Sequence, residues 1–181
     1  MELFTIGHSN HSFEEFALLL DEHGVLMLVD VRTAPFSRYN PQFNREALEQ
    51  ELPQHDIEYV FAGKYLGGRP ADPTCYKSRA LPGENVDYLH EVDYPEVMKR
   101  DWFIKGIGRL LELADEKRTA IMCSEEDPSQ CHRHHLIARY LLREYPEVTV
   151  RHIRGDGKVF SAASLRVTVD DKPEPEQPSL F

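Results

Sequence analysis

Continuous apolar runs alternate with amphipathic stretches along this chain, and the two patterns predict different elements. The short apolar runs are typical of strands covered on both faces, and they lie at residues 3–6, 25–31, 57–61, 119–123 and 148–153. The amphipathic stretches have apolar residues at helical spacing, and they lie at residues 12–22, 44–52, 95–117 and 127–144. Strands that alternate with helices predict a single three-layer α/β domain around a mainly parallel sheet.

Local signals mark where these elements begin and end. Ser12 and Glu15 have the spacing of a capping box, which starts the first helix, and Gly24 ends it. Residues 63–93 are rich in proline and glycine. A connection of this length in a compact domain is either a functional lid or a segment that contains short helices.

The C-terminal part of the chain divides into a folded end and a polar tail. Residues 155–157, Gly-Asp-Gly, predict a tight turn into a short strand at 159–160. From residue 170 on, Asp, Lys, Pro and Glu dominate, and such a segment cannot bury enough apolar surface to fold. We therefore expect an α/β domain over residues 1–169 and a disordered, acidic tail over residues 170–181.

Composition and charge exclude several classes of protein. Hydrophobic residues make up 41% of the chain, and Asp and Glu outnumber Lys and Arg by 31 to 21, which gives a formal net charge of −10. This negative field excludes a protein that coats nucleic acid with its whole surface. The 3 cysteines do not suit a disulfide-built secreted domain. Neither a signal-peptide pattern nor an apolar run of the ~20 residues that span a bilayer occurs, so we expect a soluble, cytoplasmic protein without membrane partners.

Polar side chains follow three of the predicted strands at their carboxyl ends. They are His8 and Ser9 after the first strand, Asp30 and Arg32 after the second, and Cys123 and Glu125 after the fourth. In open α/β sheets, ligands bind beyond the carboxyl ends of parallel strands. We therefore expect these side chains to form one site, although they are far apart in the sequence.

The segment after the fourth strand predicts cysteine chemistry. Cys131, His132 and Arg133 fall in the first turn of the predicted helix at 127–144, where free amides and the helix dipole lower the pKa of a thiol. Cys131 is therefore a candidate nucleophile, with His132 as its proton carrier. Alternatively, Cys123, Cys131 and His132 are ligands of a divalent metal such as zinc. A purely structural role also remains open for Cys123, because cysteine is among the most buried residue types.

One part of this acidic chain is basic. Residues 131–154 contain five Arg and four His against two Glu. Such a patch indicates a phosphate-bearing or nucleic-acid substrate, and the alternative is a solvated helix face. The sequence contains no P-loop, no dinucleotide-binding fingerprint after a strand, no cysteine-phosphatase loop and no Gly-x-Ser-x-Gly elbow.

Five ordered motifs resemble a known prokaryotic family, the domain of unknown function 488 (DUF488). They are Thr5–Asn10, Asp30–Arg32, Pro35–Arg38, Tyr65–Gly68 and the Cys123…Arg133 segment. The resemblance covers about residues 3–160 and implies a single α/β domain in which these motifs form one site. It adds candidate substrate-binding residues to those named above: Arg38, Tyr65, Gly67 and Gly68. The family name supplies no reaction.

The last residues of the chain carry a separate signal. Gln177, Leu180 and Phe181 have the spacing of the short peptide by which bacterial replication and repair proteins bind the DNA sliding clamp. In such a peptide, the two apolar side chains fill a pocket and the glutamine amide fixes the register. The alternative is a tail that docks on its own domain or has no partner.

Two functions of different classes are consistent with these residues. The first is an intracellular enzyme of DNA or nucleotide metabolism or repair, tethered to the sliding clamp. In that enzyme Cys131 is the nucleophile, Asp30 and Glu125 orient groups or exchange protons, and Arg32, Arg38 and Arg133 bind phosphate. The second is a non-catalytic module that uses its Cys/His cluster to bind a metal or to sense redox state.

Overall fold

A sheet of six strands forms the centre of the molecule in the computed structural model, which describes residues 1–83 and 86–165. The strands are β1 (Glu2–Gly7), β2 (Met27–Asp30), β3 (Glu58–Phe61), β4 (Thr119–Cys123), β5 (Thr149–Ile153) and β6 (Val159–Ser161). Their order across the sheet is β3-β2-β4-β1-β5-β6. Strands β1 to β5 are parallel and only the edge strand β6 is antiparallel, which confirms the predicted α/β class.

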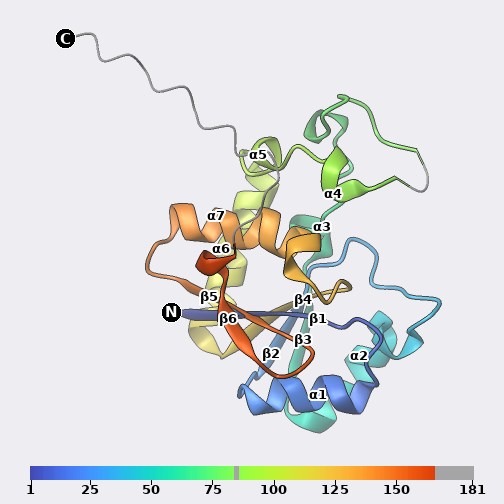
Figure 1. The fold of residues 1–181 in the computed structure, drawn as a ribbon, viewed down its shortest axis with the longest axis vertical. Coiled ribbons are helices and arrows are strands. Elements are labelled where there is room, and N and C mark those ends of the chain that lie inside the picture. Colours follow the sequence, from blue (N-terminus) through green and yellow to red (C-terminus); the bar gives the residue numbers. More distant parts are fainter. Residues whose placement is uncertain (84–85, 166–181) are drawn as a thin grey trace.

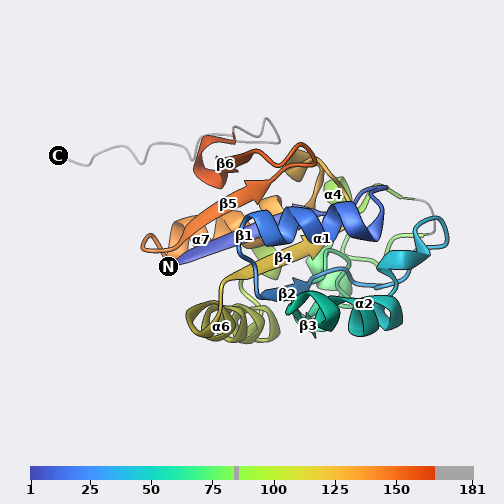
Figure 2. The ribbon, with the colours of Figure 1, turned by 90° about the horizontal axis from the view of Figure 1, so that it is seen from below.

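Helices cover both faces of the sheet and complete three layers (Figures 1 and 2). On one face lie α1 (Phe13–Glu22) and α2 (Arg45–Glu51), below the sheet in Figure 1. The other face is covered by α3 (Gly63–Leu66), α5 (Tyr94–Val97), α6 (Asp101–Glu116) and α7 (Arg139–Glu144). The strands between these layers are apolar on both faces, which explains their continuous rather than alternating apolar runs.

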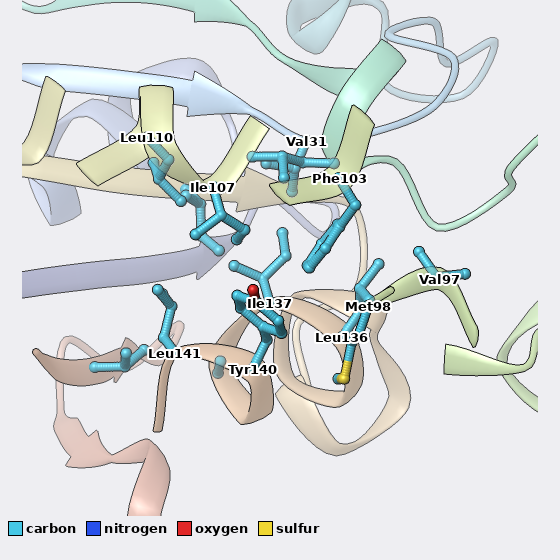
Figure 3. Packing of buried hydrophobic residues seen from close by; sticks show 14 of the residues in the cluster. Val31, Val97, Met98, Phe103, Ile107, Leu110, Leu136, Ile137, Tyr140 and Leu141 are labelled. Carbon is cyan, nitrogen blue, oxygen red and sulfur yellow. The ribbon is translucent and has the colours of Figure 1, made fainter. Parts of the chain in front are cut away.

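The larger core lies between the sheet, α6 and the helical segment that leads into α7. Figure 3 shows Phe103 and Ile107 of α6 facing Ile137 and Tyr140, and all four side chains are buried. The rings of Phe103 and Tyr140 meet edge to face with their centroids 5.0 Å apart, a favoured geometry for aromatic pairs. This packing fixes the segment that follows Cys131 against the sheet.

The predicted helix at 95–117 is wrong as a single element, because the chain forms two helices there. The side chain of Asp93 caps α5 by accepting a hydrogen bond from the backbone N–H of Glu96, 3.2 Å away. The backbone then becomes extended at Arg100 (φ −78°, ψ 132°) before α6 begins at Asp101. Both helices bury apolar residues against the same face of the sheet, so the apolar spacing continues across the break.

The predicted helix at 127–144 also begins later than expected. Asp127 caps a single 3₁₀ turn over Pro128–Gln130, and Cys131 itself is extended (φ −140°, ψ 139°). A π-helical segment, Arg133–Ala138, follows and continues into α7. Cys131 therefore precedes the helix rather than lying inside its first turn. A π-helical segment of this kind is frequent at functional sites.

Several local predictions are confirmed. Ser12 and Glu15 form the capping box of α1, and the turn before β6 has Gly157 at φ +79°. Within the long connection at 63–93 lie α3, a 3₁₀ turn and α4 (Tyr88–Glu91). The tail at 170–181 lies outside the described residues. Among the residues that the structure describes, no helix is long and apolar enough to cross a membrane.

Candidate functional site

The carboxyl ends of β1, β2 and β4 lie next to one another. Figure 2 shows β1, β4 and β2 side by side in the sheet. Gly7 is in register with Cys123, and Asp30 is in register with Met122. The backbone N–H of His8 continues the ladder by donating to the Cys123 carbonyl at 2.9 Å. The chain segments that follow these strands therefore meet at one edge of the sheet, as the parallel topology predicts.

A cavity of about 330 Å³ opens at this edge. The sequence-predicted residues in its wall are Arg32, Gly68, Cys123, Glu125, Cys131 and His132. Among the described residues, the other predicted ones do not line it. Ser9, Arg38, Tyr65 and Gly67 belong to neighbouring segments, with Arg38 and Tyr65 exposed on the surface. Four of the five predicted motifs therefore contribute part of their residues to the cavity, and the Thr5–Asn10 motif contributes none.

Two sulfurs and one imidazole form the centre of the cavity wall. His132 Nε2 donates to the Val31 carbonyl at 3.1 Å, which fixes the ring and leaves Nδ1 turned toward both cysteines. The distance from Nδ1 is 3.6 Å to Cys123 Sγ and 3.9 Å to Cys131 Sγ. All three side chains are buried, and their ligand atoms lie within 4.8 Å of one another.

The two thiols have opposite protonation tendencies. Burial raises the pKa of Cys131, but the hydrogen bond from Cys123 and the positive charges of Arg133 and His132 outweigh it and hold that pKa well below its usual range. The pKa of Cys123 is raised, first by its hydrogen bond to Cys131 and then by burial. Burial lowers the pKa of His132, but its hydrogen bond to Cys131 and the negative charges of Cys131 and Glu125 together outweigh burial and raise that pKa. These shifts favour the thiolate form of Cys131, the protonated form of His132 and the neutral thiol of Cys123.

The backbone after Cys131 adds to this stabilisation. The N–H of Arg133 donates to Cys131 Sγ at 3.4 Å, and the N–H groups of His134 and His135 donate to the Cys131 carbonyl at 3.0 and 3.3 Å. Cys131 thus caps the N-terminus of the helical segment that follows it, with its sulfur as the accepting side-chain atom. The predicted effect of a helix N-terminus on this thiol is therefore present, although Cys131 lies one step before the helix.

Glu125 brings a carboxyl group to the wall of the cavity. Cys123 Sγ lies 3.1 Å from Glu125 Oε2, so the single proton of this thiol can be donated either to the carboxyl group or to Cys131. Burial of the carboxyl group, followed by the negative charge of Cys131, raises the pKa of Glu125 above that of an ordinary glutamate. A carboxyl group with a raised pKa next to a reactive sulfur is suited to exchange protons near neutral pH.

Asp30 and Arg32 form a buried ion pair under the cavity. Arg32 Nη2 lies 2.6 Å from Asp30 Oδ2, and the Tyr59 hydroxyl donates to the same carboxylate at 2.9 Å. Arg32 Nη1 lies 3.3 Å from His8 Nε2, while His8 Nδ1 donates to the Ser9 carbonyl at 2.8 Å. Asp30 and His8 do not reach the cavity, and their contacts orient Arg32, the member of this group that does.

Arg133 is fully buried, and its hydrogen bonds are made with groups of the protein rather than with the cavity. Its guanidinium donates to the carbonyls of Glu125 and Glu126, and its Nε donates to Thr5 Oγ1 at 3.3 Å. Arg133 is buried and does not line the cavity, so in this geometry it does not contact a substrate phosphate there as predicted. It holds the loop after β4 in place and supplies positive charge to Cys131.

Two glycines allow the backbone to pack tightly around these groups. A Cβ atom on Gly68 would lie 2.6 Å from Cγ of the His132 ring, so the imidazole fits only against glycine. A Cβ atom on Gly7 would lie 1.8 Å from the Glu125 carbonyl oxygen, which is fixed backbone. Both positions therefore require glycine for steric reasons.

Another part of the cavity wall contains residues that the sequence analysis did not single out. Arg69 stacks over the Tyr88 ring at 4.5 Å, and both line the cavity. Tyr94 is buried in the same wall, and burial followed by the charges of the two cysteines raises its pKa. All three come from residues 63–94, and the length and composition of this connection were the only sequence signal for them.

The comparisons with known proteins give one result. No curated protein and no solved structure matches the chain. A model of the family described as domain of unknown function DUF488 matches residues 12–141, which include β2, β4 and the Cys123–Cys131–His132 cluster. The chain belongs to the DUF488 family.

Proposed function

We propose that the protein is an enzyme that uses Cys131 as a covalent nucleophile on a phosphate-bearing substrate of DNA or nucleotide metabolism. The observation that carries this proposal is the Cys131 sulfur, which has a lowered pKa and lies beside His132 in the wall of a cavity. The thiolate is the attacking form of cysteine, and an adjacent imidazolium holds the proton that a leaving group needs.

The groups around the sulfur support a two-step reaction. In the first step, a lone pair of Cys131 Sγ forms a bond to an electrophilic carbon or phosphorus atom of the substrate. The bond to the leaving group breaks, and the leaving group keeps the electron pair and takes the proton of His132 Nδ1. In the second step, water attacks the same atom, the thiolate leaves, and His132 takes the proton of the water. Glu125, which also lies in the cavity wall, orients that water.

Alkylation of the full-length protein with iodoacetamide tests the nucleophile. Between about pH 5 and about pH 9, we expect Cys131 to react with a midpoint below the pKa of ~8.5 of a free cysteine, and Cys123 to react only at higher pH. Cys75, which is also buried but lies outside the cavity, is the internal control. His132→Gln should raise the Cys131 midpoint. Equal reactivity of Cys123 and Cys131 would contradict the proposal.

A specific observation favours a second function, the binding of a metal. Cys123, Cys131 and His132 fit a catalytic zinc site, because zinc at such a site has three protein ligands and one position open to substrate. The hydrogen bond from His132 Nε2 to a backbone carbonyl is the usual support of a ligating imidazole. A bound zinc ion would supply a Lewis acid at the cavity wall.

Metal analysis separates the two functions. If the cluster holds zinc, protein purified without chelators contains about one zinc per chain, and Cys123→Ser loses it. Cys131 is then protected from iodoacetamide until a chelator is added. If Cys131 is instead a free nucleophile, it is alkylated without a chelator and the zinc content stays far below one per chain.

We propose further that the C-terminal peptide containing Gln177, Leu180 and Phe181 binds a bacterial DNA sliding clamp. The spacing of these residues supports this proposal, and they lie outside the described part of the chain. Binding of the full-length protein to a purified clamp should be lost in the Leu180→Ala/Phe181→Ala variant. Ser179→Ala, between the binding residues, is the matched control. Equal binding by all three proteins would contradict the proposal.

A further inference from the structure

The two cysteines of the cavity wall lie close enough to react with each other. Cys123 Sγ and Cys131 Sγ lie within 4.8 Å of each other, and the Cys123 thiol is within hydrogen-bond reach of the Cys131 sulfur. Both residues line the same cavity, so a small molecule that enters it meets the two sulfurs together. Cys75, the third cysteine of the chain, is also buried but does not line this cavity.

The backbone holds the two cysteines in this arrangement and leaves their side chains free to turn. Cys123 is the last residue of β4, and Cys131 is extended (φ −140°, ψ 139°) before the π-helical segment. The guanidinium of Arg133 fixes the loop between them by donating to the carbonyls of Glu125 and Glu126. A disulfide requires an S–S distance of ~2.05 Å, which a rotation about the Cα–Cβ bond approaches without the rotamer limits of a helix.

Their surroundings give the two sulfurs different roles. The backbone N–H of Arg133 donates to Cys131 Sγ at 3.4 Å, and His132 Nδ1 lies 3.9 Å from the same sulfur. Donors directed at a sulfur stabilise its thiolate, which is the form that attacks. Cys123 Sγ lies 3.1 Å from Glu125 Oε2, and an acceptor at this distance keeps the proton on Cys123. Cys131 is therefore the attacking cysteine, and Cys123 is the neutral thiol beside it.

We propose that a hydroperoxide oxidises this pair to a reversible disulfide, with Cys131 as the attacking cysteine and Cys123 as the resolving cysteine. A reactive thiolate next to a second cysteine is the common arrangement of redox-sensitive sites. This inference requires only the two sulfurs and a hydroperoxide, so it does not depend on the substrate of the proposed enzyme.

The oxidation takes place in two steps. First, a lone pair of Cys131 Sγ attacks the terminal oxygen of the hydroperoxide, and the O–O bond breaks. The alkoxide that leaves takes the proton of His132 Nδ1 and becomes an alcohol, while Cys131 becomes a sulfenic acid. Second, Cys123 Sγ attacks Cys131 Sγ, and the hydroxide that leaves takes the thiol proton of Cys123 and becomes water. The pair has then lost two electrons, which a dithiol returns by thiol–disulfide exchange.

Peptide mapping of the full-length protein after treatment with hydrogen peroxide tests the pair. The treatment is carried out with a chelator present, so that a bound metal does not protect the sulfurs, and the protein is then denatured and alkylated with iodoacetamide. The number of alkylated cysteines should fall from three to one, which is Cys75. Trypsin releases residues 119–133 as one peptide that contains both reacting cysteines. This peptide should be lighter by two hydrogen atoms, and dithiothreitol should restore alkylation of both its cysteines.

Two variants identify the resolving cysteine. Cys123→Ser should accumulate the sulfenic acid of Cys131, which dimedone traps, whereas the wild type should give little adduct. Cys75→Ser is the matched control, because it removes a cysteine outside the cavity, and it should form the disulfide like the wild type. Circular dichroism checks that both variants are folded, and the mapping of the wild type needs no variant.

Two results would overturn the disulfide. One is a wild-type protein that keeps all three cysteines alkylatable after peroxide, and the other is oxidation of Cys131 to the sulfinic acid while Cys123 stays a free thiol. Either result leaves the proposed nucleophile standing if Cys131 of the untreated protein still reacts with iodoacetamide at low pH. Conversely, a disulfide that forms in a protein without this reactivity supports the pair and counts against the proposed enzyme.

Discussion

Histidines that are buried in the neutral form make the stability of this protein sensitive to mild acid. His134 Nδ1 lies 3.0 Å from His152 Nε2, and His152 Nδ1 lies 2.7 Å from Thr5 Oγ1. Burial lowers the pKa of His134 to about 4 and that of His152 to about 3. Burial lowers the pKa of His8 to about 4 as well. Between pH 6.5 and about 4, the unfolded chain binds protons that the folded protein does not, so the free energy of unfolding falls as the pH drops.

The size of this effect follows from the pKa values. A histidine with a pKa of 6.5 when unfolded and about 4 when folded destabilises the protein at pH 5 by about 2 kcal/mol relative to neutral pH. His8, His134 and His152 act in the same direction, and even one such contribution is a substantial part of the ~5–15 kcal/mol that stabilises an ordinary domain. His132 acts in the opposite direction. Its raised pKa contributes stability that is present below pH 6.5 and is lost as the pH rises.

Urea unfolding followed by circular dichroism at about pH 7.5 and about pH 5 measures the effect. We expect the difference in unfolding free energy between the two pH values to shrink by about 2 kcal/mol in His152→Gln, because that variant removes one of the neutral imidazoles. His90→Gln, which changes an exposed histidine, should keep the wild-type difference. If His152→Gln retains the full difference, the buried neutral histidines are not its cause.

Three further substitutions test the packing and the charges around the site. Asp30→Asn leaves the buried guanidinium of Arg32 without its charged partner and should lower the free energy of unfolding by about 3–5 kcal/mol in urea. Glu49→Gln breaks an exposed ion pair and should cost less than about 1 kcal/mol. Similar losses in the two variants would refute the argument. Phe103→Ala should cost about 3–5 kcal/mol by the same assay, and a loss below about 1 kcal/mol would mean that the core between α6 and α7 is loosely packed. Gly68→Ala should displace the His132 ring and raise the pH midpoint of Cys131 alkylation, and an unchanged midpoint would show that the ring has room to move.

The strands and the position of the site could be predicted because both depend on local pattern and one rule of topology. Continuous apolar runs identify buried strands, and the carboxyl ends of parallel strands meet wherever the strands lie in the sequence. This rule predicts that Arg32 and Cys123 lie close together although they are far apart in the sequence, and both line the same cavity. The two helix predictions failed where a capping aspartate, Asp93 or Asp127, starts a short helical turn of its own. Apolar spacing does not show such a break when both pieces bury the same face.

The roles of individual charged residues were harder to predict than their location. Arg133 resembles a phosphate ligand in the sequence, but its donors are satisfied by backbone carbonyls from a loop that only the fold brings near it. Arg69, within the connection at 63–93, and Tyr94, directly after it, line the same cavity as the residues that follow β2 and β4. Such a long-range contact leaves no periodic signal in the sequence.

The close approach of Gly7 to the loop after β4 restricts how this site can change in evolution. The loop backbone is fixed by Gly7 on one side, by the Ser9 N–H that donates to the Ser124 carbonyl at 2.9 Å, and by the guanidinium of Arg133. An inserted or deleted residue in this loop would break all three contacts at once, so relatives should keep its length. Differences in substrate between relatives should therefore arise in the part of the wall where Arg69 and Tyr88 reach the cavity by their side chains.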